Sequence, residues 1–184
     1  VIELEEYFDQ PKFSRVPEGP DRWAILNSAE LELLKREIEA CKASFIHTAS
    51  NWFWIADKSG REVLFDLWDG QILVVEKLQD MASRGKPQFV VVIKSRQLGL
   101  SQLGCALGAH KCFFTSNQNG LIVSEDDKKT ENLWSNYSLP IYRKLPWFLR
   151  PNAISLTINS GIVLDSDPKK TNTLGLRSSI KIVS

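Results

Sequence analysis

The run of five apolar residues at 89–93, Phe-Val-Val-Val-Ile, restricts the fold of this chain more than any other stretch. Four of the five are β-branched, which favours a strand, and the absence of polar residues predicts burial on both faces. A turn containing Gly99 follows, and a helical pattern begins at Ser101. We therefore predict a unit of strand, tight turn and helix, as found in parallel sheets of α/β proteins.

The turn after this strand has the composition of an anion-binding site. Backbone N–H groups and a helix N-terminus attract phosphate. The ammonium of a lysine and the guanidinium of an arginine can bind the phosphate oxygens, and a serine hydroxyl can bind Mg²⁺. The turn and the start of the helix read Lys94, Ser95, Arg96, Gln97, Leu98, Gly99, Leu100, Ser101 and Gln102. The alternative is a buried strand followed by an ordinary solvated basic turn.

The spacing departs from the regular phosphate loop, G-x-x-x-x-G-K-[ST]. Gly99 and Ser101 keep the second glycine and the hydroxyl, whereas Lys94 replaces the first glycine and Leu100 replaces the lysine. The run Lys-Ser-Arg-Gln-Leu-Gly-Leu-Ser resembles the deviant Walker A loop of the large terminase subunit, the ATPase that packages DNA into tailed-phage heads. Some members of that family place the lysine ahead of the loop, as Lys94 is here.

Gln71 supplies a second point of resemblance. Its side chain offers one amide donor and one carbonyl acceptor, the pair needed to bind the edge of adenine. It follows Phe-Asp-Leu-Trp at 65–68 and precedes the turn in sequence. This order resembles the adenine-reading Q motif of terminases and helicases.

The resemblance implies an α/β fold: a P-loop NTPase-like core with a central, mostly parallel sheet flanked by helices. Residues 1–60 would form an N-terminal arm and a lid subdomain of helix and hairpin, and residues 61–184 the N-terminal portion of the ATPase core. ATP and Mg²⁺ are the implied cofactors. Gln71 would read adenine, backbone N–H groups at 95–100 would hold the β-phosphate, Lys94 and Arg96 would act as catalytic cations, and Ser101 would bind the metal. The implied ATP-binding residues are Gln71, Lys94, Ser95, Arg96, Gln97, Leu98, Gly99, Leu100, Ser101 and Gln102.

The family's motor couples ATP hydrolysis to packaging of double-stranded DNA into the procapsid. The expected partners are therefore DNA, the portal protein, the small terminase subunit and further copies in a ring, in the host cytoplasm and at the portal. We expect the Walker B acid and catalytic glutamate to lie beyond Ser184, which would leave this chain inactive by itself. The run Ile-Val-Leu-Asp at 162–165 imitates Walker B, but the turn at 159–161 resembles the hairpin that precedes the true Walker B strand.

Two other functions fit the same pattern. A different nucleic-acid-dependent ATPase, such as a helicase, also combines a Q motif with a phosphate loop, but normally keeps glycine and lysine at positions 94 and 100. A non-catalytic assembly module that has lost nucleotide binding would account for both departures.

The composition excludes several classes of protein. The net charge of +1 gives no overall field for nucleic acid, so any DNA contact must be local. No apolar run approaches the ~18 residues that span a bilayer, so no membrane is expected. The three cysteines lack metal-ligand spacing and indicate reduced, buried thiols. A lone histidine such as His47 is more often structural or exposed than a ligand.

Local signals place the remaining elements. Asn27 and Glu30 have the spacing of a capping box before an amphipathic helix over 28–42. A hairpin is predicted with strands over 51–56 and 62–67, then a helix capped by Asp69. A charged helix over 127–144 is expected to bend or break at Pro140. Further strands are predicted over 121–123, 155–159, 161–165 and 180–183.

Overall fold

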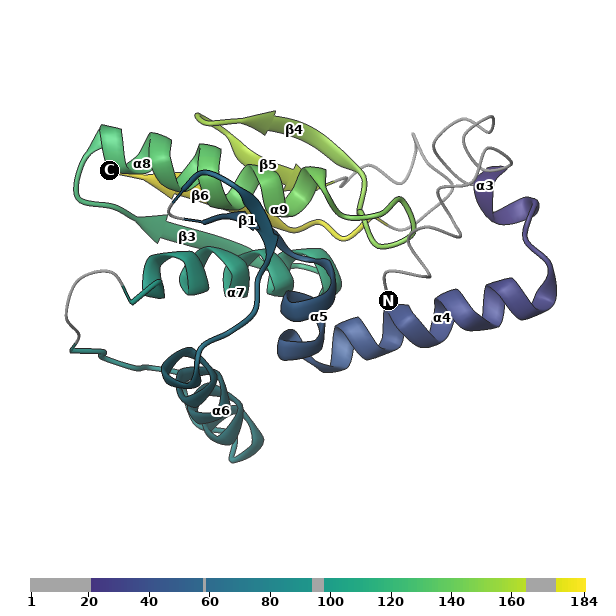
Figure 1. Ribbon diagram of the computed structural model, residues 1–184, viewed down its shortest axis with the longest axis horizontal. Coiled ribbons are helices and arrows are strands. Elements are labelled where there is room, and N and C mark those ends of the chain that lie inside the picture. Colours follow the sequence, from purple (N-terminus) through teal and green to yellow (C-terminus); the bar gives the residue numbers. More distant parts are fainter. Residues whose placement is uncertain (1–20, 58, 94–97, 165–174) are drawn as a thin grey trace.

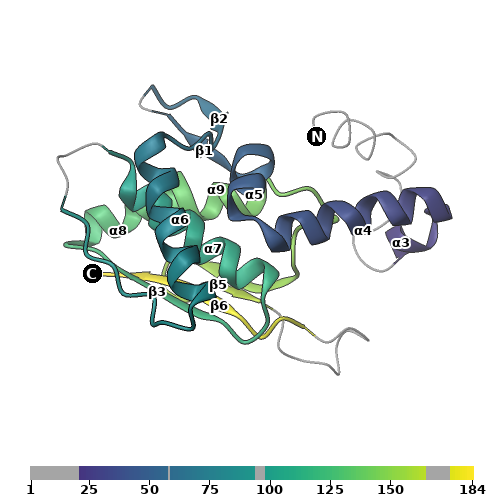
Figure 2. The same cartoon turned by 90° about the horizontal axis from the view of Figure 1, so that it is seen from below.

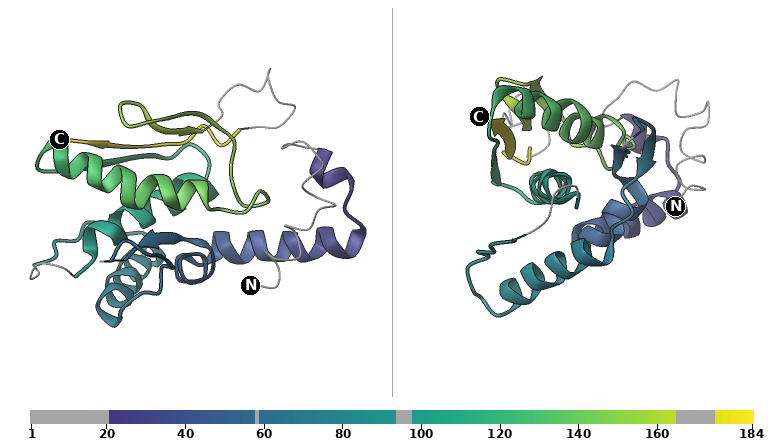
Figure 3. Two further views of the ribbon diagram at one scale, coloured as in Figure 1. Left: turned by 45° about the horizontal axis from the view of Figure 1, so that its top comes forward. Right: turned by 60° about the vertical axis from the view of Figure 1, so that its left-hand side comes forward.

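The computed structural model describes residues 21–57, 59–93, 98–164 and 175–184. It is an α/β structure built on a mixed sheet with the strand order β3-β6-β5-β4 (Figure 1). Helix α7 contacts β3 and β6, and the helical segment containing α8 and α9 contacts both β6 and α7. These helices cover the same face of the sheet (Figure 3). Among the described helices, none is long and apolar enough to cross a membrane.

One of the three strand pairings in this sheet is parallel. β3 (Asn119–Val123) runs parallel to β6 (Ser179–Val183), whereas β5 (Gly161–Leu164) runs antiparallel to β6 and to β4 (Ala153–Thr157). The predicted positions of these strands are confirmed, as is the hairpin at 159–161. The sheet is mixed and not mostly parallel, because the β4–β5 hairpin occupies one side of β6. Asp165, the acidic residue of the Walker B-like run at 162–165, lies outside the described residues.

Helix α7 (Leu100–Phe114) has more buried residues than any other helix of the described chain. Its inner face packs on the sheet and on the N-terminal helices. A Cβ atom built at Gly108 would lie 2.7 Å from Ile180 Cδ1, so a side chain there would require Ile180 to change its position. The buried residues of α7 are Leu103, Cys105, Ala106, Ala109, His110, Cys112 and Phe113.

The N-terminal helices are α3 (Asp21–Ala24), α4 (Ser28–Ala43) and α5 (Phe45–Trp52). The predicted capping box of α4 is confirmed: Asn27 Oδ1 accepts from the Glu30 N–H, and the Glu30 carboxylate accepts from the Asn27 N–H, both at 2.9 Å. α5 was not predicted, and it contains the first residues assigned above to the hairpin. Figure 2 shows α4 projecting from the body of the molecule, with α5 at its inner end.

The hairpin itself is confirmed in a shorter form. β1 (Trp54–Ala56) pairs antiparallel with β2 (Glu62–Leu64). Helix α6 (Asp69–Ser83) follows, and its N-cap is Trp68 instead of the predicted Asp69. Figure 1 shows α7 between α6 and the sheet.

The charged segment after β3 is helical throughout. α8 (Asp127–Leu133) passes into a π-helical turn, η1 (Trp134–Ser138), and then into α9 (Leu139–Arg143). Pro140 does not break the helix. It lies in the first turn of α9, directly after the π-helical turn, where the missing N–H of proline is tolerated.

The prediction of a buried strand at 89–93 is wrong for this structure. The segment has no assigned secondary structure, and in the described part of the chain no strand pairs with it. Phe89, Val91 and Ile93 are 80%, 74% and 98% exposed. The pattern of side chains indicates only a preference for extended backbone. A strand also needs neighbouring strands that form hydrogen bonds with its backbone.

We predict that Gly161→Ala destabilises the fold. Gly161 has φ +77°, and a Cβ there would lie 2.9 Å from Lys181 Cα and would overlap the Ile180 carbonyl oxygen. Backbone strain and overpacking together should lower the free energy of unfolding by about 2–4 kcal/mol, measured by urea denaturation. Gly70→Ala is the control, because nothing lies within 4 Å of its added Cβ. Equal stability of the two variants would contradict the prediction.

Candidate functional site

The side chain of Gln71 joins the start of α6 to the turn before α7. Its Oε1 accepts from the Trp68 backbone N–H at 3.1 Å. Its Nε2 donates to the Leu98 carbonyl at 3.4 Å and to the Gly99 carbonyl at 3.2 Å. Gln71 is buried, with 4% of its surface exposed. The structure thus brings together two motifs that are far apart in sequence.

Gly99 has the backbone conformation and the space that only glycine provides. It is the N-cap of α7 with φ 63°, in the left-handed region. A Cβ at this position would lie 2.7 Å from Gln71 Nε2, within the van der Waals contact distance. The second restriction follows from how closely the turn approaches α6.

The first turn of α7 is suited to bind an anion. Its leading N–H groups have no partners within the helix, and the helix dipole adds a partial positive charge. Ser101 is exposed in this turn, so its hydroxyl is available to a ligand or a metal ion, and Gln102 beside it is half-buried. Leu100 is also half-buried and packs against the hydrophobic core. Its apolar side chain therefore serves the fold at the position where a regular loop has lysine.

The four residues that precede this turn, Lys94, Ser95, Arg96 and Gln97, lie outside the described residues. Their contacts with phosphate remain predictions. The described part of the predicted site consists of Gln71 together with residues 98–102.

The amide of Gln71 is occupied by the protein itself. Donor and acceptor both have backbone partners, so in this conformation the side chain fastens the turn to α6. An adenine base that used the same amide would have to replace these partners. Adenine reading by Gln71 therefore remains a prediction, and the structure adds a second role for the same residue.

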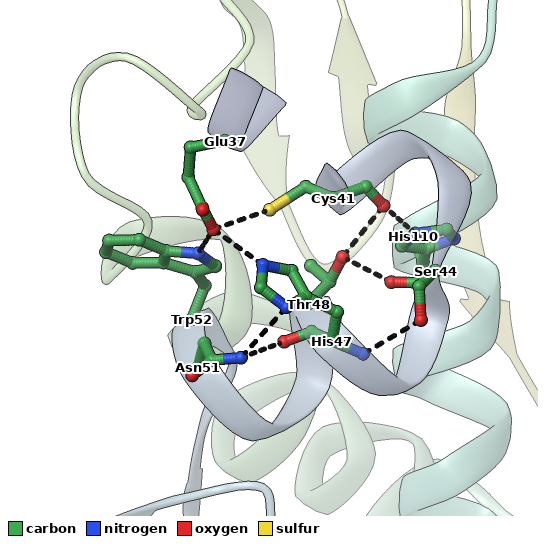
Figure 4. A network of polar contacts seen from close by, with 8 residues as sticks. All are labelled: Glu37, Cys41, Ser44, His47, Thr48, Asn51, Trp52 and His110. Atoms are coloured by element: carbon green, nitrogen blue, oxygen red, sulfur yellow. Dashed lines mark hydrogen bonds and ion pairs between the residues drawn. The ribbon is translucent and has the colours of Figure 1, made fainter. Parts of the chain in front are cut away.

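A separate polar cluster lies where α4 meets α5 (Figure 4). Glu37 Oε1 accepts from Trp52 Nε1 at 2.6 Å, and lies 2.8 Å from His47 Nε2 and 3.5 Å from Cys41 Sγ. Burial by itself would raise the pKa of Glu37, but the hydrogen bonds from Trp52 and His47 outweigh it, and the pKa lies below its usual value. Glu37 is therefore held as a carboxylate by its donors.

The backbone carbonyl of Cys41 links this cluster to the core. It accepts from Thr48 Oγ1 at 2.9 Å and lies 2.7 Å from His110 Nε2, so α4, α5 and α7 are joined at one atom. Burial lowers the pKa of His110, which favours the neutral ring. Sequence reasoning missed the cluster because it considered His47 and the cysteines separately. The spacing of Glu37 and Cys41, four residues apart on one helix face, was the available signal.

We predict that Gln71→Ala loosens the turn before α7. The variant loses the hydrogen bonds that hold the Leu98 and Gly99 carbonyls to α6. A net loss of ~1–3 kcal/mol locally corresponds to amide exchange about 5- to 150-fold faster at 99–103, measured by hydrogen–deuterium exchange. Gln79→Ala, at an exposed position of the same helix, is the control. Unchanged protection in Gln71→Ala would show that the turn is held by other contacts.

No protein-family model matches this chain, and no curated protein matches it as a relative. What the chain does therefore has to be inferred from its own residues and from their arrangement in space.

Proposed function

We propose that the chain is the N-terminal part of the ATPase domain of a terminase large subunit. The observation that carries this proposal is the contact between Gln71 and the turn at 98–99. This contact joins Gln71, the candidate adenine reader, to residues 98–99, the described end of the candidate phosphate loop. The proposal includes a P-loop NTPase-like core, of which the described sheet and α7 would form a part.

The roles of the residues follow from phosphoryl-transfer chemistry, which mainly requires positioning and neutralisation of charge. The N-terminus of α7 would bind the β-phosphate through backbone N–H groups. Lys94 and Arg96 would neutralise the triphosphate, and Ser101 would bind Mg²⁺. Because Leu100 is apolar and packs against the core, Lys94 would supply the ammonium in its place.

The intact motor would couple ATP hydrolysis to packaging of double-stranded DNA into the procapsid. It would act with the portal protein and the small terminase subunit, as one subunit of a ring, in the host cytoplasm. Nucleotide binding would be linked to the contact between α6 and the turn, because a base that hydrogen-bonds to the amide of Gln71 would release the turn from α6. Binding energy at the base would then change how α6 is held against α7.

A titration with a fluorescent ATP analogue tests the phosphate site. We predict that the parent chain binds ATP and that Lys94→Ala weakens binding at least ~10-fold, because one charge-assisted contact contributes ~1.5–3 kcal/mol. Lys77→Ala removes a mostly exposed lysine of α6 and should bind as the parent does. Absence of ATP binding by the parent would favour the non-catalytic assembly module. Normal binding by Lys94→Ala would assign the ammonium to another residue.

Competition by ATP and CTP tests the base site. If the amide of Gln71 binds adenine, Gln71→Ala should weaken the binding of ATP by ~1–3 kcal/mol, or about 5- to 150-fold. The binding of CTP should be weakened much less. The expected readout is a fall in the ratio of the two affinities. Equal losses for both nucleotides would show that Gln71 acts only by fastening the turn. Gln79→Ala again serves as the control on the same helix.

A further inference from the structure

We propose that Glu37, Cys41 and His47 form a binding site for Zn²⁺ at the junction of α4 and α5. Each offers one donor atom, and the three atoms all lie within 4.8 Å of one another (Figure 4). Carboxylate oxygen, thiolate sulfur and imidazole nitrogen are the donor types that zinc uses in proteins. This site lies away from the turn at 98–102 and does not depend on nucleotide binding.

The fold places the three donors from two neighbouring helices. Glu37 and Cys41 lie one helical turn apart on the inner face of α4, the spacing by which two ligands on one helix reach a single metal ion. Ser44 caps α5 directly after α4 ends, and its Oγ accepts from the His47 backbone N–H at 3.1 Å. The first turn of α5 thereby directs His47 back toward α4.

The present distances are close to those of a zinc site. Bonds of ~2.0–2.3 Å in tetrahedral geometry separate neighbouring donor atoms by ~3.3–3.8 Å. Glu37 Oε1 lies 2.8 Å from His47 Nε2 and 3.5 Å from Cys41 Sγ. Coordination thus requires shifts of ~1 Å or less. The side chains of His47 and Glu37 are 31% and 12% exposed, so an ion can reach the cluster from solvent.

Charge and proton balance are also satisfied. Zn²⁺ is neutralised by one carboxylate and one thiolate, so the half-buried site carries no net charge when it is filled. Binding forms the Zn–S bond and releases the Cys41 thiol proton to solvent, and the proton that His47 Nε2 donates to Glu37 would move to Nδ1 when Nε2 binds the ion. Burial, followed by the charge of Glu37, raises the pKa of Cys41, so the bound ion would have to displace the thiol proton.

Neighbouring groups support the ligands in their required states. Asn51 Nδ2 donates to the His47 backbone carbonyl at 2.8 Å and lies 3.3 Å from His47 Nδ1, so it holds the first turn of α5 and the His47 ring in place. Trp52 Nε1 can continue to donate to Glu37, because a carboxylate accepts about four hydrogen bonds. Thr48 and His110 hold the backbone of Cys41 in place.

Titration of the purified, metal-free chain with Co²⁺ tests the site, because thiolate coordination gives a near-ultraviolet charge-transfer absorption and tetrahedral geometry gives visible bands. We expect both in the parent, loss of both on addition of Zn²⁺, and a rise in melting temperature with Zn²⁺. Cys41→Ser should weaken Co²⁺ binding at least ~100-fold, more than loss of an outer partner does. Cys105→Ser is the control, since this thiol is also buried.

Glu37→Gln provides a second variant if Cys41→Ser does not fold. It keeps an oxygen acceptor for Trp52 but removes the ligand charge, so Co²⁺ affinity should fall ~10-fold or more while the charge-transfer band persists at high Co²⁺. Absence of thiolate bands in the parent overturns the proposal. Bands that survive in Cys41→Ser, or that disappear in Cys105→Ser, also overturn it by assigning the metal to another thiol.

Discussion

The close packing of Ile180 is the contact on which the arrangement of helix and sheet depends. Ile180 is buried in β6, and the glycines of three neighbouring elements surround it: Gly108 of α7, Gly120 of β3 and Gly161 of β5. A Cβ at Gly108 would lie 2.7 Å from its side chain and one at Gly120 would lie 3.3 Å away. A methyl group at any of these glycines would crowd Ile180. The position of α7 on the sheet, and with it the direction of its N-terminus, follows from this packing.

The same helix is fixed on its other side by polar contacts. His110 of α7 contacts the backbone carbonyl of Cys41. On α4, one turn before Cys41, the Glu37 carboxylate contacts Trp52 and His47 of α5. A buried carboxylate is costly unless several donors compensate it, so the cluster specifies how these helices meet. Hydrophobic packing on one side and a satisfied polar junction on the other hold α7 as a rigid platform.

The turn at the N-terminus of α7 is joined to α6 by one side chain of the described residues. Gln71 holds the Leu98 and Gly99 carbonyls, and the absence of a side chain at Gly99 makes the approach possible. If Gln71 reads adenine as proposed, its amide would have to exchange these protein partners for the base. Binding energy at the base would then be coupled to release of the turn from α6.

The sequence alone determined the elements whose signals are local. The capping box at Asn27 begins one helix, the glycine turn at 159–161 makes a hairpin, and side-chain periodicity places most helices and strands. These signals are readable because they involve residues that are close in the chain. Only the tertiary structure decided which distant groups meet. The run 89–93 has every local property of a strand but stays exposed, since the described strands offer it no pairing. Likewise, no spacing rule reveals that Gln71 fastens a turn or that His47 faces Glu37, because such contacts arise from how helices pack.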